Sequence, residues 1–156
     1  MLVKHLTVGG LRSYRPEPVH VDLAPLTLVF GPNSAGKSSL LSVLPMLQQT
    51  AARPEVLTMS GDVVEGGTFR MAIHQHDETL PMTLGFGWLL PDGTTHSGSG
   101  QFRWDADRKV AVRTRMDLDD GTAQTHVEGH RPWAGQPGAE AARALGPEFY
   151  DVLSRI

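Results

Sequence analysis

The sequence predicts an α/β fold made of a small strand–turn–helix unit followed by an antiparallel β-meander. Residues 26–30 (LTLVF) form a continuous apolar run, typical of a strand that is buried on both faces. A glycine-rich turn leads from this run into residues 37–50, whose apolar positions favour a helix. Residues 109–118 alternate in polarity, which indicates a half-buried antiparallel strand.

Before the apolar run we expect two further elements. Residues 2–8 read as a short strand that ends at paired glycines, and residues 19–23 form a second short apolar run. Pro45 falls inside the predicted helix, where a proline removes one backbone donor and kinks the axis. The first unit is therefore predicted to be a lobe over residues 1–54.

The second half of the chain reads as a β-subdomain over residues 55–128. Four strands are expected within residues 80–128, with a turn at residues 91–93 and a hairpin loop at residues 97–100. Phe86, Trp88, Phe102 and Trp104 are predicted to be core or sheet-packing residues. Residues 129–156 are predicted to form a loop and short helical pieces, at 139–145 and 148–155.

Composition narrows the class of protein. The chain has 156 residues, no cysteine and a formal net charge of −3. These values exclude a disulfide scaffold and a cysteine-ligated metal site, and they argue against a small basic nucleic-acid binder acting alone. No apolar run is long enough for a membrane span and no signal peptide is recognised, so we expect a cytoplasmic protein without a membrane partner.

The strongest chemical signal is the spacing Gly, four residues, Gly-Lys-Ser, which is typical of a phosphate-binding loop. Glycines allow the backbone to wrap closely around phosphates, and several N–H groups then point inward. Lys37 can reach the β- and γ-phosphates of a nucleotide, and the Ser38 hydroxyl is placed to bind Mg²⁺. The predicted site residues are Gly31, Pro32, Asn33, Ser34, Ala35, Gly36, Lys37 and Ser38.

The stretch LTLVFGPNSAGKSSLLSVL resembles the ATPase heads of the ABC class, of the SMC, RecF and OLD-like AAA kind. The resemblance is strong over residues 1–50. It implies ATP and Mg²⁺ as cofactors, adds Ser39 to the loop, and implies that Asn33 orients groups near the γ-phosphate. The Gly-Leu-Arg-Ser-Tyr segment at residues 10–14 matches a family segment beside the nucleotide, so Arg12 and Ser13 are implied to lie near the phosphates or base.

In such ATPases two heads sandwich ATP, so the resemblance implies a head-to-head dimer and a role in bacterial DNA repair or phage defence. Several of the family's motifs are not recognisable here. No residue is assigned as the acidic Mg²⁺ ligand after a second buried strand, and the Ser-Gly-Ser-Gly run at residues 97–100 is better explained as a loop. Gln48, Gln49 and Gln75 remain open as the γ-phosphate-sensing glutamine.

Two other groups of residues have spacings that suggest a function. His74 and His76 have metal-ligand spacing, but a solvated turn explains them better because no third ligand is recognised. Arg113 and Arg115 are predicted to share an outward strand face that could contact DNA, although an ordinary charged face is the simpler interpretation.

The sequence therefore predicts the ATP- and Mg²⁺-binding N-terminal lobe of an incomplete ABC-class ATPase head. The remaining part of the ATPase, on the same or a second polypeptide, is expected to supply the groups needed for hydrolysis. Two alternatives remain open: a nucleotide-binding interaction module without turnover, and a small P-loop kinase.

Overall fold

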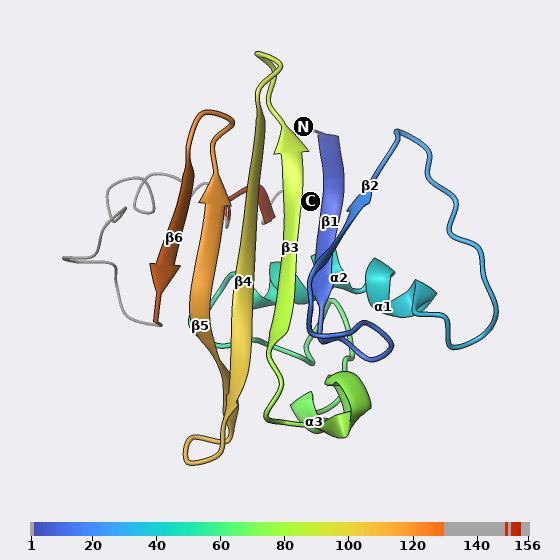
Figure 1. Cartoon of the computed structure of the whole chain (residues 1–156), viewed down its shortest axis with the longest axis vertical. Coiled ribbons are helices and arrows are strands. Elements are labelled where there is room, and N and C mark those ends of the chain that lie inside the picture. The colour runs from blue at the N-terminus through green and yellow to red at the C-terminus, as the bar shows by residue number, and fades with distance from the viewer. Residues whose placement is uncertain (1, 130–148, 150, 154–156) are drawn as a thin grey trace.

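The computed structural model describes residues 2–129, 149 and 151–153 and shows one open sheet of six antiparallel strands (Figure 1). The strand order is β2-β1-β3-β4-β5-β6. The strands are β1 (Leu2–Gly9), β2 (Val19–Asp22), β3 (Met82–Leu89), β4 (Thr95–Asp105), β5 (Val110–Asp119) and β6 (Gln124–Glu128). The helices are α1 (Lys37–Leu41), α2 (Val43–Thr50), α3 (Phe69–Ala72) and the 3-10 turn η1 (His74–His76).

The predicted α/β fold class is wrong, because the described chain is mainly β and its strand pairs are all antiparallel. The expected buried strand at residues 26–30 is not a strand. Leu26, Leu28 and Phe30 are 79%, 65% and 83% exposed. β1 pairs with β2 on one side and β3 on the other, so both places beside β1 are occupied, and residues 26–30 pair with no strand in the described residues.

The predicted meander is confirmed, since β3, β4, β5 and β6 are consecutive antiparallel neighbours. The turn at residues 91–93 is also confirmed, and the Thr94 N–H donates to the Asp92 carboxylate at 2.9 Å there. The hairpin loop expected at residues 97–100 is wrong, because these residues lie inside β4. Gly98 has a packing reason instead: a Cβ at this position would lie 2.4 Å from the ring of Phe149.

The alternation of β5 changes phase within the strand. The register shifts at Gln101 and Phe102 of β4, so that Thr114 is the extra residue between Arg113 and Arg115. Such a bulge turns the following side chains to the other face. Arg113 is only 4% exposed, and its Nη1 lies 3.6 Å from the sulfur of Met116. The prediction that Arg113 and Arg115 share one outward face is therefore wrong.

The predicted helix over residues 37–50 is divided at Ser42 into α1 and α2. Pro45 is the third residue of α2, where a helix does not yet need the backbone N–H that proline lacks. The Ser42 hydroxyl donates to the carbonyl oxygen of Ser39 at 2.8 Å at the break. Pro45 therefore lies in the first turn of α2, where a proline is tolerated. The break in the helix lies three residues earlier, at Ser42, and not at Pro45 as expected.

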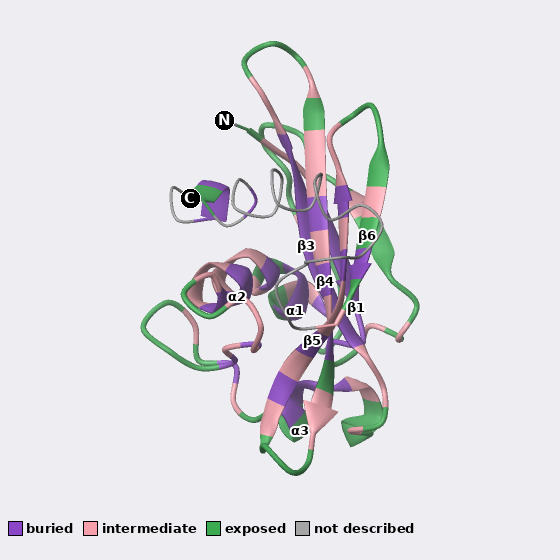
Figure 2. Ribbon diagram, turned by 90° about the vertical axis from the view of Figure 1, so that its left-hand side faces the viewer, coloured by how far each residue is buried: buried purple, intermediate pink, exposed green. Residues whose placement is uncertain are grey.

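Among the described helices, α1 and α2 lie over one face of the sheet, as the edge-on view shows (Figure 2). Phe86 and Trp88 of β3 are fully buried on that face, and the Phe149 ring centroid lies 4.9 Å from that of Phe86. Phe102 is also buried, and the partly buried Trp104 packs against this core, as predicted. The helix predicted at 139–145 lies outside the described residues, and residues 149 and 151–153 are helical.

No helix in the described part of the chain is long and apolar enough to cross a membrane.

Candidate functional site

Residues 31–38 form an exposed loop that enters α1 through Gly36, which is buried. Gly36 has φ +90°, a conformation that residues with a Cβ rarely adopt. A Cβ there would also lie 2.9 Å from the Tyr14 ring and 3.1 Å from the Ser13 hydroxyl. Glycine is therefore required at this position for two separate reasons, its φ angle and the lack of space.

Lys37 closes the loop on itself. Its Nζ donates to the carbonyl oxygens of Gly31 at 2.8 Å and Pro32 at 2.6 Å. An ammonium group has three donors, so one remains for an anionic oxygen after these two hydrogen bonds. The only full positive charge between Asp22 and Arg53 is thereby held on the loop.

The loop also carries backbone donors that are not used. Ala35 N–H donates to the Pro32 carbonyl at 3.3 Å. Within the described residues, no hydrogen bond takes up the N–H groups of Asn33, Ser34, Gly36 or Lys37. Unpaired N–H groups at a loop that enters a helix are suited to bind phosphate oxygens.

The two serines after Lys37 differ in environment. Ser38 is exposed, and no hydrogen bond of its hydroxyl is found in the described part of the chain. Ser39 is 3% exposed, and its carbonyl oxygen accepts from the Ser42 hydroxyl. Ser38 is therefore available to a ligand or metal ion, whereas Ser39 supports the helix break.

The segment predicted to lie beside the loop does meet it, through Ser13 and Tyr14 at Gly36. Arg12 and Ser13 are exposed, and Arg12 has φ +52°. The Arg12 N–H donates to the Ala72 carbonyl at 2.6 Å, and the Arg12 carbonyl oxygen lies 2.7 Å from Nδ1 of His74. This turn is therefore held by contacts with α3 and η1, and within it Ser13 lies beside the loop while Arg12 is exposed.

Tyr14 and His74 were not predicted to shape the site. Burial raises the pKa of the Tyr14 hydroxyl, as expected for a phenol packed against the loop. The aromatic residue that ends the Gly-Leu-Arg-Ser-Tyr segment was visible in the sequence, but its packing on Gly36 is a tertiary contact. His74 is likewise 62 residues away from the carbonyl oxygen that it contacts.

The three candidate glutamines lie in different environments. Gln49 is a structural brace: its Nε2 donates to the Thr58 carbonyl at 2.8 Å, and its Oε1 accepts from the Val64 N–H at 3.2 Å. Gln48 is half-buried on α2, and Gln75 lies in η1 with φ +55°. None of these observations brings a glutamine to residues 31–38.

No group of three or more histidine, aspartate or glutamate side chains that could hold a metal ion is found among the described residues. His76 Nδ1 lies 2.9 Å from the Arg70 carbonyl oxygen, so both histidines of the suggested pair contact backbone carbonyls. Arg115 forms an ion pair with Asp117 at 2.6 Å and lies 3.8 Å from Glu128. The basic face considered for DNA contact is therefore not formed by these arginines.

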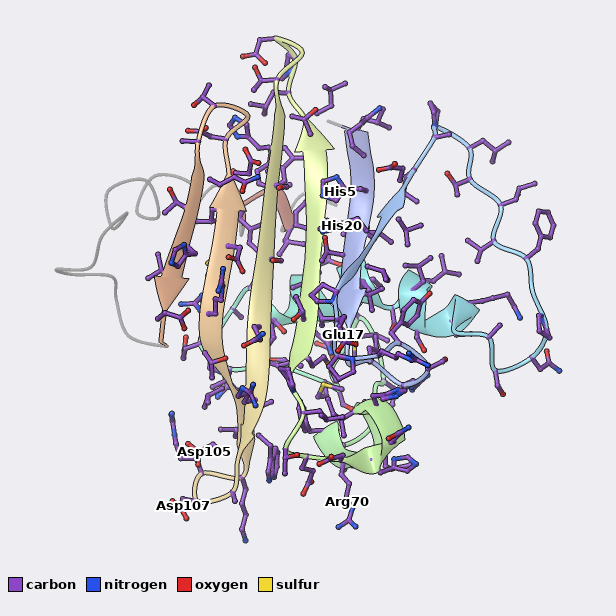
Figure 3. The ribbon with its side chains drawn as sticks, in the orientation of Figure 1. His5, Glu17, His20, Arg70, Asp105 and Asp107 are labelled. Carbon is purple, nitrogen blue, oxygen red and sulfur yellow. The ribbon has the colours of Figure 1, made fainter. Side chains whose placement is uncertain are left out.

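A hollow of about 490 Å³ lies elsewhere, on the face of the sheet opposite the helices. His5 and His20 line it, with ring centroids 5.7 Å apart (Figure 3). Burial and the neighbouring His20 lower the pKa of His5, against a smaller raising effect of Asp22. Its lining includes no residue of the phosphate-binding motif, so the two sites are distinct.

The sequence matches no protein-family model and no curated protein. A proposal about function therefore rests on the motif and on the geometry of the loop.

Proposed function

We propose that residues 31–38 bind the phosphates of ATP together with Mg²⁺. The observation that carries this proposal is the set of unused backbone N–H groups at Asn33, Ser34, Gly36 and Lys37, next to the Lys37 ammonium. Four backbone donors and one cation suit a chain of anionic oxygens better than any neutral ligand.

Each residue has a role that follows from its position. Lys37 would shift from its present carbonyl partners toward a phosphate oxygen, using its third donor or releasing one of the two in place. Ser38 would supply a hydroxyl to Mg²⁺, because it is exposed and its hydroxyl is uncommitted within the described chain. Gly36 keeps the backbone close, since any larger residue would push against Tyr14. ATP itself supplies the charge and the transferable phosphoryl group.

Binding alone is not hydrolysis. Phosphoryl transfer to water also needs an acidic Mg²⁺ ligand and a residue that positions the water. In the part of the chain that is described, no hydrogen bond or ion pair joins an acidic side chain to residues 31–38. We therefore expect this chain to bind ATP weakly and to leave it intact, with the missing groups coming from the remaining part of the ATPase. That part would lie on the same or a second polypeptide.

The test is calorimetric titration with ATP and Mg²⁺. Lys37→Gln should lower the affinity about 10- to 100-fold, because a hydrogen bond to a charged group contributes about 1.5–3 kcal/mol. Lys109→Gln is the matched control, since it removes the same charge from the turn between β4 and β5. Equal affinities of the two variants would contradict the proposal.

A phosphate-release assay separates binding from turnover. We expect no release above the uncatalysed background from the purified chain. Robust hydrolysis that Lys37→Ala abolishes would show that the described chain already holds a complete active site.

A further inference from the structure

The hollow on the sheet face opposite α1 and α2 is not used by the proposed function. All six strands contribute to its lining, among them His20 of β2, His5 of β1, Thr83 of β3, Ser99 of β4, Asp117 of β5 and His126 of β6. Because neighbouring strands lie about 4.8 Å apart, the six span about 24 Å. A volume of about 490 Å³ over that width makes the hollow long and shallow. Its shape therefore suits a chain of several small units that lies across the strands.

Two glycines of β3 leave room for side chains that lean into the hollow. A Cβ at Gly87 would overlap the imidazole ring of His5, and a Cβ at Gly85 would overlap the side chain of Ser99. His5 is half-buried, and its ring meets that of His20 edge to face (Figure 3). The glycines thus let His5 and Ser99 lie close to the sheet, so the hollow stays open above the middle strands.

Thr83 supplies the observation that points to a ligand. Its side chain lines the hollow, and the residue is only 5% exposed. Within the described residues, its Oγ1 has no hydrogen-bond partner. A buried hydroxyl without a partner destabilises a fold, and such groups are uncommon in native proteins. A hydroxyl group of a ligand that enters the hollow at Thr83 would supply the missing partner.

The charged groups of the hollow are already paired with the protein. Arg115 is the only arginine or lysine among the described residues that line it, and its Nε and Nη2 donate to Asp117 at 2.9 and 2.6 Å. The Asp119 carboxylate accepts from Nε2 of Gln124 at 3.1 Å. Burial lowers the pKa of His5, which favours its uncharged form near neutral pH. An anionic ligand would therefore find no unpaired guanidinium or ammonium group here.

The uncharged groups of the hollow are available by contrast. In the part of the chain that the structure describes, no hydrogen bond uses the hydroxyl of Ser97 or Ser99. The Gln101 Oε1 accepts from Thr114 at 3.4 Å, and the amide nitrogen keeps two donors that no described residue takes up. The backbones of β3 and β4 pair with strands on both sides, so a ligand meets side chains only. These side chains suit an uncharged ligand rich in hydroxyl groups.

We propose that the hollow binds a short neutral oligosaccharide, held by the uncharged side chains of β3 and β4. Each sugar hydroxyl both donates and accepts, so it can pair in either direction with the hydroxyls of Thr83, Ser97 and Ser99. A chain of sugar rings matches the long and shallow shape and needs no unpaired charge. The proposal is independent of the phosphate-binding loop, because no residue of that loop lines the hollow.

The test is an NMR titration of the full chain with four neutral trisaccharides: maltotriose, cellotriose, mannotriose and triacetylchitotriose. We expect at least one of them to bind with a Kd of about 1 mM or below. The N–H signals of Thr83, Ser97 and Ser99 should shift and saturate, and that of Gly93 should stay in place. The inference is overturned if none of the four gives a saturable shift, or if the shifts fall only outside the hollow.

A variant at Thr83 makes the test specific, because it has two expected effects. Thr83→Val keeps the shape and removes the hydroxyl, so affinity for the bound trisaccharide should fall about 2- to 10-fold. The urea midpoint of the free chain should stay the same or rise, since a buried hydroxyl without a partner is removed. Thr95→Val is the matched control, at an exposed residue of β4 outside the hollow, and should leave affinity unchanged.

A second variant covers the neighbouring strand. Ser99→Ala keeps the Cβ beside Gly85 and removes a hydroxyl, so it should weaken trisaccharide binding without lowering the urea midpoint. A lower midpoint in Thr83→Val would show that its hydroxyl already has a partner in the free chain, and that result would overturn the inference. Full affinity in both Thr83→Val and Ser99→Ala would overturn it as well.

Discussion

Two apolar segments of this chain, β3 and residues 26–30, have opposite environments. β3 lies between β1 and β4, and all but the last of its residues are buried. Residues 26–30 are similarly apolar, yet Leu26, Leu28 and Phe30 face solvent. The difference shows that an apolar run specifies a tendency to be buried, whereas the neighbouring strands decide whether the burial occurs in this chain.

The largest expected effect compares one phenylalanine from each segment. Phe86→Ala should destabilise the fold by about 3–5 kcal/mol, because it removes a fully buried ring that contacts Trp88 and Phe149. Phe30→Ala should change the unfolding free energy by less than about 0.5 kcal/mol, since its ring is mostly in water. Urea denaturation measures both. A large loss at Phe30 would mean that residues 26–30 are packed.

A second comparison uses two glycines with nearly the same φ angle. Gly36 has φ +90° against Tyr14, and Gly93 has φ +89° with no atom within 4 Å of the place where a Cβ would lie. Gly93→Ala should cost about 1–2 kcal/mol from backbone strain. Gly36→Ala should cost about 2–4 kcal/mol, because overpacking against Tyr14 is added to the strain.

The same pair of glycine variants tests the loop. Gly36→Ala should also weaken ATP binding in calorimetry, whereas Gly93→Ala should not change it. Equal stability losses would show that Tyr14 moves aside freely and does not shape the loop.

A third, smaller effect concerns the helical cover of the sheet. Gln49→Ala should destabilise the fold by about 1–3 kcal/mol, because it leaves the Thr58 carbonyl and the Val64 N–H without their side-chain partner. Gln48→Ala, one residue earlier on α2, should cost less than about 0.5 kcal/mol. Thermal unfolding of both variants measures the difference. Equal losses would refute the bracing role of Gln49.

The smallest expected effect is a pH dependence of the stability of the fold. It arises from His5, which lies on the sheet face opposite the helices. The folded-state pKa of His5 is lowered, mainly by burial, so the unfolded chain binds more protons below pH 6.5. Stability should therefore decline as the pH falls from 6.5 toward the folded-state pKa of His5. His5→Gln should flatten this decline in urea midpoints measured between about pH 7.5 and 5.5, and His126→Gln, at an exposed position, serves as the control. An unchanged slope in His5→Gln would contradict this assignment.

Sequence reasoning succeeded where the determinants are local. The alternation over residues 109–118 and the Pro-Asp-Gly turn at residues 91–93 predicted parts of the meander, because strand patterning and turn chemistry act over a few residues. The phosphate-binding motif likewise predicted that Gly36 is needed for its backbone conformation, and its φ angle is one that only glycine adopts readily. Whether that loop binds phosphates stays a prediction.

The predictions that are wrong concern features that depend on contacts between residues far apart in the sequence. Gly98 looked like a loop residue because the ring that needs its space, Phe149, lies 51 positions later. The buried Arg113 follows from the extra residue Thr114, and a bulge leaves no clear mark in a polarity pattern. The expected α/β lobe is wrong for the same kind of reason, since residues 26–30 have the pattern of a central strand but pair with no strand of the described sheet.

The central claim, that residues 31–38 hold the phosphates, is tested most directly by amide NMR shifts during titration with ATP and Mg²⁺. We expect the largest shifts at the N–H groups of Asn33, Ser34, Gly36 and Lys37, with none at Gly93. Adenosine, which has no phosphates, should leave the four loop signals in place. Shifts centred on the His5 and His20 hollow, with residues 31–38 unchanged, would contradict it.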